Sequence, residues 1–121
     1  MIAVFDTNIL IDALNGVANA DAEYCRYERV LISCITWIEV MVGAKASEEK
    51  QLRDFLDTNF EVIPLDNAIA EAAVLLRRQH HLRLPDAVIW DTAQVNGADL
   101  VTRNTKDFKP EWAGIRVPYT L

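Results

Sequence analysis

The sequence predicts an α/β protein, a three-layer α/β/α sandwich in which helices cover both faces of a five-stranded parallel sheet. Two observations lead to this class. Five short segments are apolar enough to be buried strands, and helical segments separate the first four of them. Parallel strands are usually covered on both faces, so they read as continuous apolar runs rather than as alternating ones.

The first part of the chain alternates strand and helix. Residues 2–5 (IAVF) are wholly apolar, and Ile9, Leu10 and Ala13 then fall on one side of a helix. The expected elements are a strand over 2–5, a helix over 8–14, a polar helix over 18–28, a strand over 30–34 and a helix over 36–44.

The second part repeats this order and carries clearer boundary signals. Ser47 with the following glutamates is typical of a helix start, and Pro64 ends a strand. Asp66 or Asn67 is expected to cap a long helix, and Gly97 to end the next. The expected elements are a helix over 47–58, a strand over 60–65, a helix over 68–82, a helix over 86–97, and strands over 98–103 and 115–119.

Composition limits the possible functions. The 121 residues, 51% of them hydrophobic, suit one domain over residues 1–121. A net charge of −6 argues against a protein that holds nucleic acid by bulk attraction to phosphate. A nucleic-acid role therefore needs a local feature of the surface that attracts phosphate. Cys25 and Cys34 are expected to be reduced core thiols, and with no signal peptide or membrane span the protein is expected in the cytoplasm.

Asp6 is the first candidate for chemistry, because it ends the first strand. In open parallel sheets the functional crevice lies beyond the carboxyl ends of the strands. The alternative interpretation is that Asp6 caps the helix that follows.

Glu39 and Asp86 are the second and third candidates. Glu39 lies in a helical segment that is apolar nearly all round, so we expect it to be buried and to need a cation, a proton or a metal. An ion pair with an arginine is the alternative. Asp86 begins a helix just after Pro85, where the helix dipole alone would favour an acid.

The segment TRNTKDF (102–108) carries Thr102, Asn104 and Asp107 past the end of the fourth strand, although such residues also occur in ordinary turns. Two carboxylates about 4 Å apart repel by roughly 4 kcal/mol at an effective dielectric of 20, so a cluster of acids needs counter-charge. Oxygen ligands favour Mg²⁺ or Mn²⁺ over zinc. His80 and His81 point about 100° apart on a helix and are not expected to share a metal.

Four stretches in this order, FDTNILID, TWIEVMVG, LPDAVIWDTA and LVTRNTKDF, resemble the motif blocks of PIN-domain ribonucleases. They are most similar to those of the VapC-type toxins of bacterial toxin–antitoxin pairs. The resemblance spans residues 2–108 and implies a PIN-like fold, a divalent-metal site and endonucleolytic cleavage of RNA. It also implies a homodimer and a cognate antitoxin whose tail lies across the active groove.

The resemblance also implies roles for individual residues. Asp6, Glu39 and Asp86 match the three nearly constant acids, and Asp107 is assigned as the fourth. Asn104, where many relatives have Asp, is expected to be an amide that either supports the ligands or is itself one. All four acids are expected to be catalytic and to bind the metal. Asp91 has no counterpart and is expected at the surface or an interface. The expected substrate contacts are Thr7, Asn8, Thr102, Arg103 and Asn104.

The expected reaction is metal-assisted hydrolysis of a phosphodiester, with basic residues between 77 and 109 holding the flanking phosphates. Single-stranded or loop RNA is the expected substrate, because its bases are exposed. Two alternatives stay open. Asp6 could be the nucleophile of a phosphatase of the haloacid dehalogenase type, although Asn8 stands where that class has a second acid; or the chain could be a PIN-fold binding module without activity.

Overall fold

The computed structural model describes residues 1–121 and contains a five-stranded sheet with the strand order β3-β2-β1-β4-β5. Every neighbouring pair is parallel, as the sequence predicts. The strands are β1 (Ile2–Phe5), β2 (Arg29–Ser33), β3 (Glu61–Ile63), β4 (Asp99–Val101) and β5 (Ile115–Arg116).

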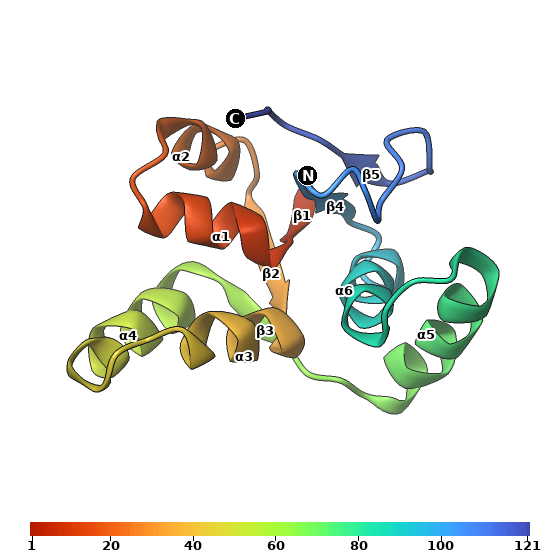
Figure 1. Ribbon diagram of the computed structural model, residues 1–121, viewed down its shortest axis with the longest axis horizontal. Helices are drawn as coiled ribbons and strands as arrows, with labels where there is room; N and C mark the ends of the chain where they lie inside the picture. Colours follow the sequence, from red (N-terminus) through yellow and green to blue (C-terminus); the bar gives the residue numbers. More distant parts are fainter.

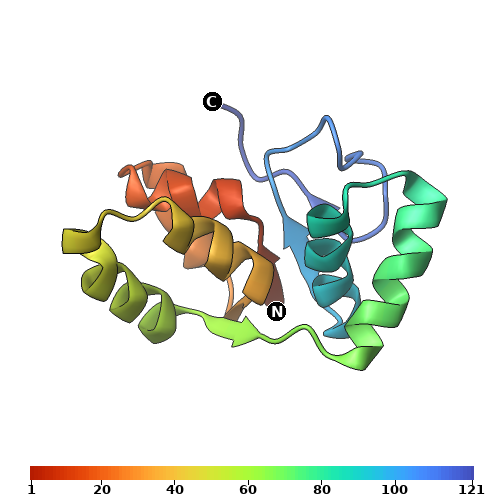
Figure 2. The ribbon, with the colours of Figure 1, turned by 60° about the horizontal axis from the view of Figure 1, so that its bottom comes forward.

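Six α-helices cover the sheet, and Figure 1 shows them in two groups, with α1 to α4 on one side and α5 with α6 on the other. Figure 2 shows the same division from a second direction. The α/β/α sandwich is therefore confirmed. The helices are α1 (Thr7–Leu14), α2 (Ala18–Tyr24), α3 (Cys34–Val42), α4 (Glu49–Asn59), α5 (Asn67–His80) and α6 (Leu84–Val95), with a short 3₁₀ turn at Ala46–Glu48 before α4. None of them combines the length and apolar character that a membrane span requires.

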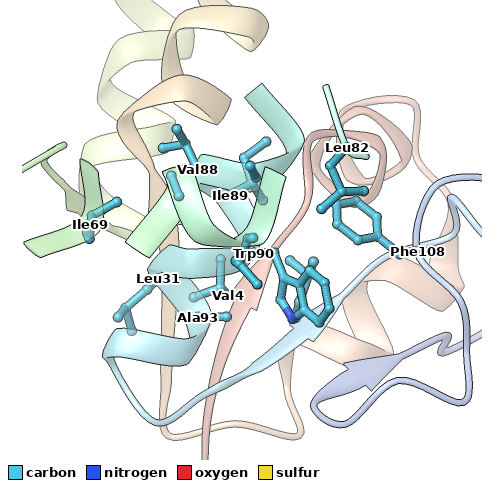
Figure 3. Packing of buried hydrophobic residues seen from close by; sticks show 13 residues of the cluster. Val4, Leu31, Ile69, Leu82, Val88, Ile89, Trp90, Ala93 and Phe108 are labelled. Atoms are coloured by element: carbon cyan, nitrogen blue, oxygen red, sulfur yellow. The ribbon is translucent and has the colours of Figure 1, made fainter. Parts of the chain in front are cut away.

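Strands β1 to β4 each contribute to two hydrophobic cores because successive side chains point to opposite faces of the sheet. In β1, Ala3 and Phe5 belong to the core under α1 to α4, whereas Val4 belongs to the core under α5 and α6. Figure 3 shows this second core, in which Trp90 of α6 packs beside Phe108. The continuous apolar runs of the strands follow from this double burial.

Several predicted details differ in the structure. The helix expected over 18–28 ends at Tyr24, and the strand expected over 60–65 keeps only three residues. The helix expected over 86–97 begins at Leu84 and ends at Val95, so Pro85 lies in its first turn, where its missing N–H costs nothing. Cys25 is exposed, so it is not a core thiol.

Asp91 was expected at the surface or an interface, and the surface interpretation is wrong. Its side chain is buried in the middle of α6, with 1% of the residue exposed, and its Oδ2 has no hydrogen-bond partner. Burial is the main reason that the pKa of Asp91 rises to about 6, and the nearby charge of Asp66 adds to it. The helical pattern placed Asp91 away from Asp86 but could not show that other elements cover that side.

Candidate active site

A polar crevice of about 330 Å³ opens at the end of the sheet where β1 and β4 finish. The first turns of α1 and α6 and the middle of α3 also reach it. In open parallel sheets this is the end at which ligands bind. The lining residues are Asp6, Thr7, Asn8, Ile11, Glu39, Arg83, Asp86, Arg103 and Asn104.

Asp6 links β1 to α1 and is 5% exposed. Its Oδ1 accepts a hydrogen bond from the backbone N–H of Thr7 at 2.8 Å, which caps α1. Its Oδ2 accepts from the Thr102 hydroxyl at 2.7 Å and from the Asn8 amide at 3.1 Å. Asp6 is therefore a helix cap and a member of the crevice at the same time, so the two interpretations of its position do not exclude each other.

The pKa of Asp6 is raised to about 6. Burial is the main cause, because the charged carboxylate is partly desolvated there. The hydrogen bonds from Thr102 and Thr7 lower the pKa, while the charges of Asp86 and Glu39 raise it. The carboxylates thus interact across the crevice, and the hydrogen bonds do not fully compensate the negative charge.

Glu39 is exposed, so the prediction of a buried glutamate is wrong. The reason is that α3 is covered on one side only: Ile38 and Val42, next to Glu39 on the helix, are 49% and 79% exposed. The Glu39 carboxylate accepts a hydrogen bond from the Thr7 hydroxyl at 2.7 Å and forms no ion pair with an arginine. It therefore faces the crevice as a solvated carboxylate.

Asp86 is 5% exposed, and its Oδ2 lies 3.2 Å from Nε of Arg83, one turn earlier. The Arg83 side chain is 72% exposed, and its Nη2 lies 3.9 Å from Oδ2 of Asp107. Burial raises the pKa of Asp86 although Arg83 opposes the shift, and the charges of Asp107 and Glu39 add to the rise. Arg83 is thus the cation that lies between two of the predicted acids.

Asp107 does not line the crevice itself. Its carboxylate accepts a hydrogen bond from the Asn104 side-chain amide at 2.9 Å, and its N–H donates to Oδ1 of Asn104 at 3.2 Å. This reciprocal pair fixes the turn after β4. Asn104 lines the crevice, and Asp107 lies behind it beside Arg83.

All five residues expected to contact substrate have hydrogen-bond partners within the protein, and in Thr102 and Arg103 these partners engage the hydroxyl and the guanidinium that would bind RNA. Thr102 is fully buried, and its hydroxyl donates to Asp6. Arg103 lines the crevice, but its guanidinium forms two hydrogen bonds to Asp12, at 2.6 and 2.8 Å. Both residues are therefore held by the protein itself.

No three His, Cys, Asp or Glu side chains converge closely enough to hold a metal ion in the present arrangement. The donor chemistry nevertheless suits a hard divalent cation, because every candidate donor is a carboxylate, hydroxyl or amide oxygen. The raised pKa values of Asp6 and Asp86 show that their negative charge lacks sufficient compensation. The residues present therefore fit a cation in charge and donor type. The Arg83 guanidinium lies beside two of these acids, Asp86 and Asp107.

The sequence placed Arg83 only among the basic residues expected to hold flanking phosphates, and it did not single out Asp12 or Tyr119. The contact of Arg83 with Asp86 could have been predicted, because side chains three residues apart at the start of a helix lie close enough to form an ion pair. The contacts of Asp12 and Tyr119 could not, because their partners are distant in the chain.

The family model of the PIN domain matches residues 3–109. A chain of a toxin–antitoxin complex from Klebsiella pneumoniae is 43% identical with a TM-score of 0.90, and the match covers 98% of this chain and 99% of that chain. No curated protein matches.

Two more distant solved structures share the fold. VapBC2 from Rickettsia felis, bound to a DNA fragment of its promoter, gives 23% identity and a TM-score of 0.76 over 95% of this chain and 96% of that chain. FitAcB from Neisseria gonorrhoeae gives 22% identity and a TM-score of 0.77 over the full length of both chains. At this identity the likeness concerns the fold alone.

Proposed function

The chain belongs to the PIN domain family, and on this basis we propose that it is a divalent-metal-dependent endoribonuclease, the toxin of a type II toxin–antitoxin pair. One observation carries the proposal. Asp6, Glu39 and Asp86 come from three separate elements and line one crevice at the carboxyl end of a parallel sheet. Acids so far apart in the sequence have no structural need to share one solvent-filled site.

Asp6, Glu39, Asp86 and Asp107 are the proposed ligands of Mg²⁺ or Mn²⁺. A cation held there would lower the pKa of a bound water and stabilise the charge that develops on the phosphate. Asp86 and Asp107 become available when the Arg83 guanidinium leaves them, and its exposed side chain is free to do so. The surrounding residues then act on the acids: Thr7 and Thr102 orient the carboxylates of Glu39 and Asp6 through their hydroxyl groups.

The substrate contacts follow from the same crevice. The hydroxyl and amide groups of Thr7, Asn8 and Asn104 line it and are proposed to contact the RNA backbone. Arg77 and Arg78 on α5, a few residues before Arg83, are exposed and form no ion pair. They border a groove of about 640 Å³. We propose that they bind flanking phosphates, which lets a protein of net charge −6 act on RNA.

An RNA cleavage assay tests the activity. The purified protein should cut single-stranded or loop RNA with Mg²⁺ or Mn²⁺ and leave 5′-phosphate ends, because water attacks and the 3′ oxygen departs. Asp86→Asn should abolish cleavage. Asp57→Asn, at an exposed acid of α4 outside the crevice, should retain it. Cyclic phosphate ends would contradict the mechanism, since they require attack by the 2′-hydroxyl.

An antitoxin partner is supported by the similarity to a chain of a toxin–antitoxin complex. A groove of about 470 Å³ between α1, α3 and α4 is lined by apolar side chains, among them Leu14, Leu52 and Phe55, and is proposed to bind it. Ile11 lines both this groove and the crevice, so a segment bound in the groove would reach the acids. Expression of the protein alone should arrest growth, and co-expression of the antitoxin should restore it.

A homodimer is the proposed assembly. Leu65, Val74 and Leu84 are each about half exposed and line an apolar groove of about 210 Å³ beside α5 and α6. Exposed apolar clusters of this kind mark interaction sites. Sedimentation of the protein should give twice the monomer mass, and Val74→Glu should shift it to the monomer.

The phosphatase alternative is not favoured by membership of the PIN family. Asn8 stands where the second acid of that class would be needed, and its amide donates to Asp6. A binding module without activity remains the second candidate, favoured by the contact of Arg83 with Asp86 and Asp107. Cleavage in the assay above would exclude it.

A further inference from the structure

A second set of charged side chains lies next to the crevice, and the proposed reaction does not use it. Asp12 of α1, Arg103 after β4 and Tyr119 near the C-terminus form what we call the Asp12 cluster. Arg103 donates two hydrogen bonds to Asp12, at 2.6 and 2.8 Å, and the Tyr119 hydroxyl donates a third at 2.7 Å. The Asp12 residue is 5% exposed, so these bonds are largely shielded from water.

The hydrogen bonds within the Asp12 cluster keep Asp12 negatively charged. Hydrogen bonds from Arg103 and Tyr119 lower the pKa of Asp12 against the effect of burial, so the carboxylate stays ionised. Bidentate contacts between arginine and a carboxylate are strong and directional. The guanidinium also lies 6.0 Å from the centroid of the Tyr119 ring. Three segments, α1, the exit of β4 and the C-terminal tail, are thus held at one point.

This point connects to Asp6 through two short paths. The backbone N–H of Arg103 donates to Oδ1 of Asn8 at 3.1 Å, and Nδ2 of Asn8 donates to Oδ2 of Asp6. Thr102, directly before Arg103, donates its hydroxyl to the same oxygen. Arg103 is therefore bonded to one of the two donors to Oδ2 of Asp6, Asn8, and adjoins the other, Thr102, in the chain.

The donors leave the two oxygens of Asp6 different from each other. A carboxylate oxygen has two lone pairs. Oδ2 accepts two hydrogen bonds, from Thr102 and Asn8, while Oδ1 accepts only one, from the N–H of Thr7. Oδ1 is consequently the oxygen with a lone pair left for a ligand.

We propose that Asp12, Arg103 and Tyr119 are positioning residues, which hold Asn8 and Thr102 against Oδ2 of Asp6 and so direct Oδ1 to the cation and substrate. The catalytic consequence rests on the function proposed above, whereas the effect on the geometry of Asn8 and Asp6 does not. Arg103 thereby acts through its neighbours rather than by contact with RNA.

The chain contains a matched control for this proposal. Glu23 of α2 accepts two hydrogen bonds from Arg116 of β5, at 2.6 and 3.0 Å, and one from the Tyr27 hydroxyl at 2.7 Å. Glu23 is 4% exposed, close to the value for Asp12. This Glu23 cluster has the same chemistry, but none of its residues lines the crevice.

The test compares Arg103→Lys with Arg116→Lys, and Tyr119→Phe with Tyr27→Phe. Each lysine keeps the positive charge and loses the bidentate geometry, and each phenylalanine removes one hydroxyl. Stability is measured by urea unfolding. Hydrogen exchange of the Arg103 amide and the side-chain amide signals of Asn8 are followed by NMR on the metal-free protein, and kcat and KM are measured for RNA cleavage.

Both members of each pair should lose similar stability. Only Arg103→Lys and Tyr119→Phe should shift the Asn8 signals, speed exchange at Arg103 and lower kcat, by about 10- to 100-fold for Arg103→Lys, with KM little changed. Equal effects of the two pairs on the Asn8 signals would overturn the proposal. If Arg103→Lys does not fold, Tyr119→Phe carries the test alone.

The outcomes separate the two proposals. If the wild-type protein cleaves no RNA, the proposed function fails, and the NMR comparison still decides whether the Asp12 cluster positions Asn8. If it cleaves RNA and Arg103→Lys raises KM with kcat unchanged, Arg103 contacts the substrate and the positioning role is wrong.

Discussion

Replacement of Asp6 by Asn separates the charge of this residue from its role as a helix cap. Asn is as good a cap as Asp, so the bond from the Thr7 N–H can be kept. What the variant removes is a negative charge that burial and two neighbouring carboxylates oppose. We therefore expect Asp6→Asn to abolish cleavage and yet to stabilise the metal-free protein at neutral pH.

The size of the effect follows from the pKa of Asp6. A rise from 3.8 to about 6 corresponds to about 3 kcal/mol of destabilisation at neutral pH, at 1.36 kcal/mol per pKa unit. The Asn8 amide would lose an acceptor and the Thr102 hydroxyl would have to turn away from the new amide, at a combined cost of about 1–2 kcal/mol. The expected net gain at pH 7 is about 1–2 kcal/mol.

The sign of the effect depends on pH. Because the folded-state pKa is raised, the wild-type penalty is absent below pH 3.8, grows between 3.8 and about 6, and is complete above that value. Near pH 4 the folded-state side chain is neutral in both proteins, so Asp6→Asn should there be less stable than the wild type by about 1–2 kcal/mol, the cost of the changed hydrogen bonds.

Urea unfolding followed by tryptophan fluorescence, with EDTA present and at several values between pH 4 and pH 8, measures this difference. Asp57→Asn is the control, because this exposed acid has no ion pair and should show little change at any pH. A variant of Asp6 that is less stable than the wild type by more than about 1 kcal/mol at pH 7, with the same deficit at pH 4.5, would refute the reasoning and leave hydrogen bonding as the main role.

Three further predictions concern the cation and the buried acids. Arg83→Ala should strengthen Mn²⁺ binding by about fivefold in calorimetry at pH 8, because the weak ion pair of the exposed Arg83 with Asp86 no longer has to be broken; unchanged or weaker binding would show that Arg83 does not compete. Asp91→Asn should raise stability at pH 7 more than at pH 4, since burial raises the pKa of Asp91 to about 6, and urea unfolding at the two pH values measures this. Chelation by EDTA should stop RNA cleavage without a change in the melting temperature, whereas melting on chelation would indicate a structural metal.

The sequence predicted the positions of Asp6 and Asp86 well because both lie at element ends. A strand that ends in an acid, and a helix that begins with one after proline, bring both residues to the same end of a parallel sheet. The environment of Glu39 was predicted wrongly, because Glu39 lies in the middle of a helix and not at the end of an element. Helical periodicity shows which residues share a face, but not whether any element covers that face, and one side of α3 stays open.

The fourth acid illustrates a second limit. The sequence placed Asn104 and Asp107 after β4, and both lie there. The sequence could not show that Asn104 lines the crevice while Asp107 lies behind it beside Arg83. That difference depends on side-chain hydrogen bonds within one turn, which the residue types alone do not specify.

The sequence by itself determined the alternation of strands and helices, the parallel sheet and the family motifs, because apolar periodicity and turn residues act over a few neighbouring positions. Only the tertiary structure decided the charged contacts. Arg103 meets Asp12 across 91 residues and Tyr119 meets it across 107, because β4 lies beside β1 in the sheet and the C-terminal tail returns to α1. Such pairs depend on which elements become neighbours, and no local pattern of residues encodes that order.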